Sequence, residues 1–225
     1  MVFRFMTVLL LLASAAFGQT ASERLDALLE RDWEWRLREF PTLATYVGDP
    51  RYQDRLTDMS FEAIERRREF RRDLLAEIRS IERDGLEPED RLNYDLIRRN
   101  LEREIEGFQF PDELMPINQM GGVHQDLAEL AIMMPKRTVT DYRNLIARMR
   151  AYPRLVYQTM SLMGRGLESG IVPPKEPLRG VEDAIAAQIH DDPPASPLWQ
   201  IAFAKMPESI PAAEQAELRA EAFTV

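Results

Sequence analysis

Apolar residues recur every three or four positions along most of this chain, and no segment alternates apolar and polar residues as a half-buried strand does. A period of this kind predicts amphipathic helices, each with one stripe of side chains turned towards a core. The predicted helices cover about residues 22–40, 60–84, 88–106 and 126–134, and further helices start near residues 138, 153, 181 and 211. We therefore predict an all-α fold of antiparallel amphipathic helices.

Residues that cap and stop helices support these boundaries. Ser22 and Ser60 each precede an apolar stripe and can cap a helix through the side-chain oxygen. Thr138 is followed three residues later by Asp141, a weak form of the capping box. Pro41 is expected to end the first helix, because a proline disfavours helical geometry in the residue before it.

The second and third predicted helices are joined by a short turn, and two prolines further along the chain are expected to start helices. Gly85 is the expected stop of the second helix, and Pro153 is expected to begin a separate helix. The final stretch from Pro211 shows no clear apolar stripe. The residues expected on the buried stripes of the first three helices are Leu25, Leu28, Leu29, Trp33, Leu37, Phe40, Ile64, Leu74, Leu75, Ile78, Ile81, Leu92, Leu96, Leu101 and Ile105.

Charge excludes one class of function and cysteine content excludes another. The chain has 225 residues and a formal net charge of −9, which argues against nucleic acid as a partner. Residues 65–72 form a local basic run, which we interpret as a solvated helix face with ion pairs. There is no cysteine, so disulfides, thiolate metal sites and a cysteine nucleophile are excluded.

The first 18 residues are typical of a signal peptide. Arg4 gives a positive start, an apolar core follows, and small residues lead to an expected cleavage site after Gly18, with Ala15 as the second choice. The apolar core is shorter than the roughly 20 residues of a membrane span. We expect a periplasmic or secreted protein with no membrane contact beyond export.

One loop between predicted helices differs from the rest of the chain, because residues 116–125 contain no Asp, Glu, Lys or Arg. Its candidate binding residues for a peptide substrate are Asn118, Gln119, Gly121, Gly122 and His124. The amides can hydrogen-bond a peptide backbone, the glycines permit close approach, and His124 lies near a helix start that favours a neutral imidazole or an anion. The alternative interpretation is a tight connection between helices whose amides are satisfied within the protein.

Motifs for catalysis are missing from the sequence itself. His124 and His190 are the only histidines, and neither has the spacing of a zinc motif. No nucleophile elbow, phosphate loop or dinucleotide fingerprint is present. We therefore assign no catalytic residue and no metal ligand, and expect no cofactor in this chain. The methionines at 133–134 and along 149–163 are interpreted mainly as core residues, with an adaptable pocket as the alternative.

Seven segments in a fixed order resemble the bacterial domain-of-unknown-function family 885. They are residues 39–49, 51–52, 54–56, 90–95, 116–124, 134–138 and 170–174. Members of this family are large helical proteins similar to zinc metallopeptidases of the gluzincin type. Their His-Glu-x-x-His-like segment lies in a C-terminal half that has no counterpart here.

The resemblance implies that residues 19–225 are the helical N-terminal portion of a family member, which covers and shapes a cleft. Zinc and a peptide substrate are implied for the complete protein, and no zinc ligand is carried over to this chain. Two alternatives stay open: a stand-alone periplasmic helical binding module that uses the central loop, and a helical interaction protein without a ligand.

Overall fold

The computed structural model describes residues 19–225, so the predicted signal peptide lies outside the described residues. Within this range the chain forms nine α-helices and no strand, which confirms the all-α prediction. The helices are α1 (Ala21–Glu39), α2 (Pro41–Tyr46), α3 (Phe61–Arg79), α4 (Pro88–Gly107), α5 (Val123–Met133), α6 (Val139–Ser169), α7 (Val181–Ala186), α8 (Pro197–Ala202) and α9 (Ala212–Phe223). Single turns of 3-10 helix lie at η1 (Pro50–Tyr52), η2 (Arg83–Gly85), η3 (Asp112–Leu114), η4 (Glu176–Leu178) and η5 (Pro193–Ala195).

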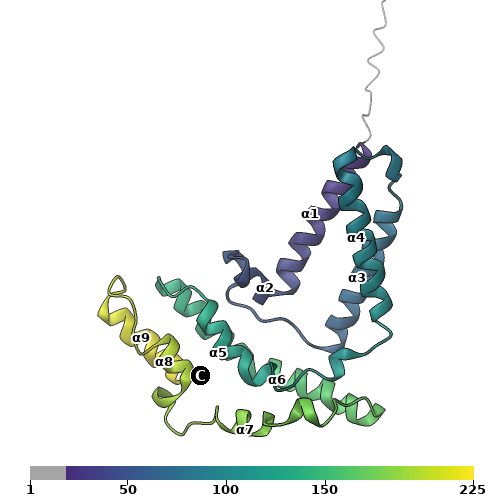
Figure 1. The fold of residues 1–225 in the computed structure, drawn as a ribbon. Coiled ribbons are helices and arrows are strands. Elements are labelled where there is room, and N and C mark those ends of the chain that lie inside the picture. Colours follow the sequence, from purple (N-terminus) through teal and green to yellow (C-terminus); the bar gives the residue numbers. More distant parts are fainter. Residues whose placement is uncertain (1–18) are drawn as a thin grey trace, which may run out of the picture.

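The helices form two units, each with its own buried core (Figure 1). In the N-terminal unit, α3 runs opposite to α1 and α4, and the joint between α3 and α4 confirms the predicted antiparallel pair. In the C-terminal unit, α5, α6, α8 and α9 pack together. The C-terminal core is built from Leu130, Ala131, Met134, Tyr142, Leu145, Ile146, Ala202, Phe203, Ile210, Leu218 and Ala222.

Local capping signals position several helices as predicted. Ser60 caps α3, accepting from the Ala63 N–H at 3.3 Å, and Pro88 occupies the first turn of α4. The capping box of Thr138 and Asp141 at the start of α6 is complete in both directions. These three features are set by residues within one helical turn, which is why the sequence predicts them.

Other predicted boundaries are wrong. Helix α1 is capped by Thr20, whose hydroxyl accepts from the Glu23 N–H at 3.1 Å, whereas the Ser22 hydroxyl accepts from the Glu87 N–H of the neighbouring joint. Helix α3 ends at Arg79 and not near residue 84, and Gly85 belongs to the turn η2. Helix α5 begins at Val123, three residues before the predicted start.

Pro153 does not begin a helix, because α6 continues through it. The proline removes one backbone hydrogen bond, but its ring is exposed, and buried residues lie on both sides of it along α6. Helices α2 and α8 were not predicted. In α9 the predicted lack of a stripe is also wrong, since Leu218 and Ala222 are buried against the C-terminal core.

The predicted stripes of α1 and α4 are confirmed at some positions and wrong at others, since Leu25, Leu28, Leu37 and Leu101 are buried as predicted. Trp33, Leu92 and Leu96 are exposed, whereas Trp35 and Tyr94 are buried. Trp35 stacks on Phe70 of α3 with ring centroids 4.1 Å apart, and this contact orients the inner face of α1.

The basic run at residues 65–72 is also not a uniformly solvated face. Arg71 is only 2% exposed and forms an ion pair with Asp32 of α1. A side chain from the presumed solvent face therefore lies inside the N-terminal unit.

Arg148 of α6 connects the two units. It is fully buried and donates to the carbonyl of Arg55 at 2.8 Å and to the Thr45 hydroxyl at 2.8 Å. It also donates to the carbonyls of Tyr52 and Pro41. Burial lowers the pKa of Arg148 to about 10, and the guanidinium stays charged at neutral pH.

Gln158 forms a second connection between α6 and the start of α3. Its amide accepts from the Met59 N–H at 3.0 Å and donates to the Asp58 carboxylate at 2.8 Å. Arg67 of α3 adds a hydrogen bond to the Asp58 carbonyl at 2.8 Å.

None of the helices in the described part of the chain combines the length and apolar character that a membrane span requires.

Candidate functional site

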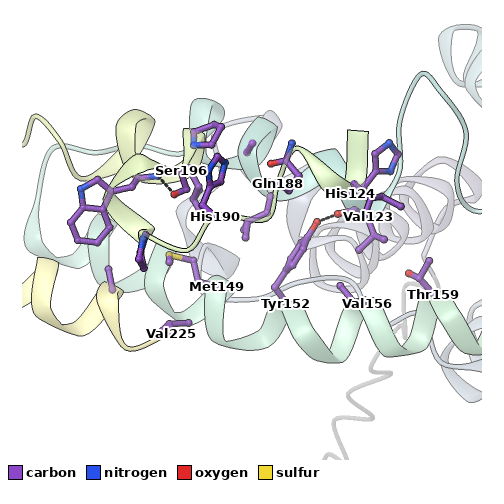
Figure 2. A pocket seen from close by; sticks show the side chains of 18 of the residues that line it. Val123, His124, Met149, Tyr152, Val156, Thr159, Gln188, His190, Ser196 and Val225 are labelled. Atoms are coloured by element: carbon purple, nitrogen blue, oxygen red, sulfur yellow. Dashed lines mark hydrogen bonds between the residues drawn. The ribbon is translucent and has the colours of Figure 1, made fainter. Parts of the chain in front are cut away.

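A cavity of about 640 Å³ lies in the C-terminal unit, between α5, α6 and the segment 185–199 (Figure 2). Its volume falls in the range of about 300–1,000 Å³ that is typical of small-molecule sites. Most of the wall is apolar and includes Leu127 and Ala128 of α5 and Val156 of α6. Trp199, Phe203 and Phe223 contribute aromatic rings from the C-terminal segments.

Three methionines of α6 contribute to the cavity wall. Met149, Met160 and Met163 all line it, so the alternative interpretation of these residues as part of an adaptable pocket describes their position. Met160 is also exposed to solvent, whereas Met149 packs against the C-terminal core. Flexible thioether side chains suit a wall that accommodates apolar groups of varied shape.

Tyr152 of α6 holds the first turn of α5 against the cavity. Its hydroxyl donates to the carbonyl of Val123, as Figure 2 shows. Burial raises the pKa of Tyr152, and the charge of Asp126 adds to this, so the hydroxyl remains a donor at neutral pH. Tyr152 therefore fixes the position of α5 relative to α6.

His124 lies one residue into α5 and is the only one of the five predicted binding residues that lines this cavity. Its Nε2 lies 3.2 Å from the side-chain nitrogen of Gln125. Its Nδ1 is shielded from solvent and has no hydrogen-bond partner among residues 19–225. The prediction that His124 lies near a helix start agrees with this position.

The two predicted amide residues lie outside the cavity and are used within the loop. Asn118 is exposed, and its side-chain oxygen accepts from the Met120 N–H at 2.8 Å. The Gln119 N–H donates to the carbonyl of Pro177 at 2.7 Å, and its side-chain amide, with nitrogen towards the same turn, donates to the carbonyls of Glu176 and Pro177. These contacts match the interpretation of the loop as a tight connection, and a role in substrate binding stays a prediction.

The two glycines of the loop differ from each other. Gly122 has φ +136°, and a Cβ there would lie 3.0 Å from the carbonyl oxygen of Pro116, so a side chain at this position would be strained. A Cβ at Gly121 would meet open space. Gly122 thus lets the loop fold back on Ile117 and directs the chain into α5.

A second cavity of about 400 Å³ lies on the other face of α5, next to Leu56 and Met59. Val123, Tyr152 and Thr159 line both cavities, so these side chains form the wall between them. Asp126 lines the second cavity. Its side chain is exposed to solvent, but nearby protein removes part of its hydration. That desolvation raises the pKa of Asp126, and Glu129 adds to the effect.

The described residues do not fit a zinc ion. Among residues 19–225 there is no group of three or more histidine, aspartate and glutamate side chains that could hold a metal. His124 and His190 both line the large cavity, but Figure 2 shows them on different walls, His124 beside Val123 and His190 beside Ser196.

Residues 41–225 match the family described as "Bacterial protein of unknown function (DUF885)". The matched range includes every residue of both cavities except Phe40. The chain belongs to the DUF885 family. No curated protein matches it.

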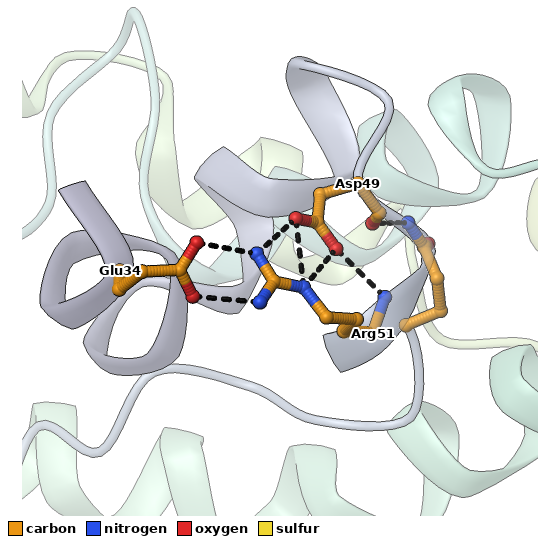
Figure 3. Close-up of polar contacts among 4 residues, drawn as sticks. Glu34, Asp49 and Arg51 are labelled. Carbon is orange, nitrogen blue, oxygen red and sulfur yellow. Dashed lines mark hydrogen bonds and ion pairs between the residues drawn. The ribbon is translucent and has the colours of Figure 1, made fainter. Parts of the chain in front are cut away.

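Within the DUF885 match, segments that carry the resemblance form joints between helices. Arg51 donates to Asp49 at 2.6 Å and to Glu34 of α1 at 2.6 Å, and so ties the joint after α2 to α1 (Figure 3). Lys136 donates to the carbonyl of Met134 at 3.1 Å and to that of Ala131, which caps the end of α5. Neither Arg51 nor Lys136 lines the large cavity.

Sequence reasoning missed most of the cavity residues. Gln188 lies in the helix predicted from residue 181, Ser196 lies in the proline-rich stretch 190–197, and Trp199 follows that stretch. Neither these three residues nor Tyr152 are predicted site residues. The useful signal was the alignment of Met149, Tyr152 and Val156 at helical spacing, which continues the inner face of α6.

Proposed function

We propose that this DUF885 protein is exported and that its large cavity binds the apolar part of a peptide-like substrate. The observation that carries the proposal is the cavity itself, which combines mainly apolar walls, three methionines and a few polar groups. In this proposal the chain binds and orients the ligand.

The wider role follows from the family resemblance. We infer that residues 19–225 form the cleft-shaping N-terminal portion of a zinc-dependent hydrolase, in which residues outside this chain hold the metal. The geometry that supports this inference is the open position of the cavity at the edge of the C-terminal unit, where His190 and Gln188 line its exposed side. No step of the chemistry is assigned to residues of this chain.

A binding titration with a neutral apolar fluorophore, N-phenyl-1-naphthylamine, tests the proposal. Ala128 lines the cavity, and Ala128→Phe fills part of it, so we expect binding to weaken about tenfold or more. Ala76→Phe on the exposed surface of α3 is the matched control and should leave the affinity unchanged. Equal affinities for the native chain and a folded Ala128→Phe variant would refute the cavity as the site.

A further inference from the structure

The Nδ1 atom of His124 is a polar atom whose hydrogen bond is not made within the described chain. Buried polar atoms in proteins are nearly always hydrogen-bonded, because an unmade bond costs about 1–3 kcal/mol. Since His124 lines the cavity, a bound molecule is the natural source of the missing partner.

The neighbouring amide determines what kind of partner is missing. The Gln125 side-chain nitrogen lies 3.2 Å from Nε2 of His124, and an amide nitrogen is a donor only. With the amide nitrogen in this position Nε2 accepts, which places the ring proton of a neutral imidazole on Nδ1. The free atom is thus a donor, and its partner must be an acceptor.

The other shielded polar groups of the wall are already engaged. The Tyr152 hydroxyl donates to the carbonyl of Val123, and the Thr159 hydroxyl donates to the carbonyl of Leu155 at 2.9 Å. The Ser196 hydroxyl accepts from the Trp199 N–H at 3.2 Å. His190 and Gln188 are exposed, so water can satisfy them. Among these wall atoms, Nδ1 of His124 is the shielded one that lacks a hydrogen-bond partner within residues 19–225.

We infer that the cavity selects ligands in which an apolar body adjoins an uncharged carbonyl oxygen, and that the Nδ1–H of His124 donates to that oxygen. This inference rests on the proposed function and adds the class of ligand. A carbonyl suits the site better than a carboxylate, because the Asp126 carboxylate lies two residues along α5 and would repel a second negative charge. His124 is therefore a residue that determines specificity, and it is not assigned a step in catalysis.

Two fluorophores with the same carbon skeleton provide the test. The first is 6-propionyl-2-(dimethylamino)naphthalene, and the second is the 6-propyl compound, which lacks the carbonyl oxygen. We expect the carbonyl compound to bind the native chain roughly fivefold more tightly, the size of one net hydrogen bond. Its emission should also shift to the red on binding relative to an aprotic solvent, because its carbonyl receives a proton donor.

Three variants distinguish the atoms of His124. His124→Leu should abolish the preference between the two fluorophores while the 6-propyl compound still binds. In His124→Asn the amide nitrogen takes a position close to that of Nδ1 and should restore the preference, whereas His124→Gln places its amide near Nε2 and should not. His190→Leu, on the other wall, is the matched control and should retain the preference.

The outcomes separate the inference from the proposal beneath it. If neither fluorophore binds, the proposed apolar site fails. If both bind the native chain with equal affinity, or if His124→Gln restores the preference and His124→Asn does not, the site stands and the assignment of Nδ1 as carbonyl donor is overturned. Thermal unfolding of each variant identifies loss of fold, and the Asn and Gln pair decides the question if His124→Leu does not fold.

Discussion

Arg71 of α3 and Asp32 of α1 form an ion pair inside the N-terminal unit, where both side chains are almost completely buried. The Nε atom of Arg71 also donates to Glu104 of α4 at 3.0 Å, and the guanidinium lies over the Trp35 ring. One cation thereby contacts all three helices of the unit. Because each charge has lost its water, each depends on the others for compensation.

Removing the carboxylate of Asp32 should destabilise the fold strongly. In Asp32→Leu the buried Arg71 keeps only its ion pair with the more exposed Glu104. We therefore expect the free energy of unfolding to fall by about 3 kcal/mol. The matched control is Glu77→Leu, which breaks the exposed pair with Arg31 and should cost less than about 1 kcal/mol. Urea denaturation measures both, and equal losses would show that Arg71 does not depend on Asp32.

Two glycines of α6 should respond oppositely to alanine. A Cβ at Gly166 would lie 2.6 Å from the carbonyl oxygen of Ile171, so Gly166→Ala should destabilise by about 1–3 kcal/mol. A Cβ at Gly164 would meet open space, so Gly164→Ala should stabilise by up to about 1 kcal/mol through helix propensity. Melting curves of the two variants test the close packing of α6, and a neutral Gly166→Ala would contradict it.

Arg148 should be essential for the connection between the units. Arg148→Met leaves the carbonyls of Arg55 and Tyr52 and the Thr45 hydroxyl without this donor, and we expect a loss of about 3–5 kcal/mol. Arg150, two positions along α6, forms an exposed pair with Glu221, so Arg150→Met is the control and should cost under about 1 kcal/mol. Hydrogen exchange at residues 41–56 should accelerate in Arg148→Met, and unchanged protection there would refute the role of Arg148.

Acid should weaken the contact between α6 and the start of α3. Burial raises the pKa of Asp58, but hydrogen bonds from Ser60 and Gln158 and the charge of Arg154 lower it by more, so the net shift is below the ordinary 3.8. A carboxylate with a lowered folded pKa stabilises the fold above its unfolded pKa, and this contribution disappears as pH falls through the folded value. The melting temperature should therefore fall below about pH 3.8, and the fall should be shallower in Asp58→Asn; identical slopes would contradict the prediction.

We expect the mature protein to begin at Gln19, because small residues precede an expected cleavage site after Gly18. Cell fractionation followed by N-terminal sequencing measures this. A cytosolic product that keeps Met1 would disprove export.

Short-range signals explain what was predictable from the sequence. The Thr138–Asp141 capping box and the cap at Ser60 depend on neighbours within one turn, so both could be identified without a structure. The burial of Arg71 and Arg148 could not, because their partners lie 39 and up to 107 residues away. Nor could the continuity of α6, since Pro153 is tolerated only because packing holds the turns on both sides.

In the candidate site, too, local signals were predictable from the sequence and contacts between distant segments were not. His124 was identified because a histidine in an uncharged loop at a helix start is unusual in this chain. Asn118 and Gln119 share that loop, but the turn at 176–177 occupies Gln119, and this contact spans almost 60 residues. Trp199 enters the cavity through α8, a helix too short to leave a periodic signal.

The two cores have a consequence for the order in which the chain matures. All buried residues of the first core lie between Leu25 and Leu101, and all those of the second lie between Leu130 and Ala222. As an exported polypeptide emerges with its N-terminal end first, the three-helix unit can therefore close before the second unit has emerged. Arg148 and Gln158 arrive later, and they dock a surface that has already folded.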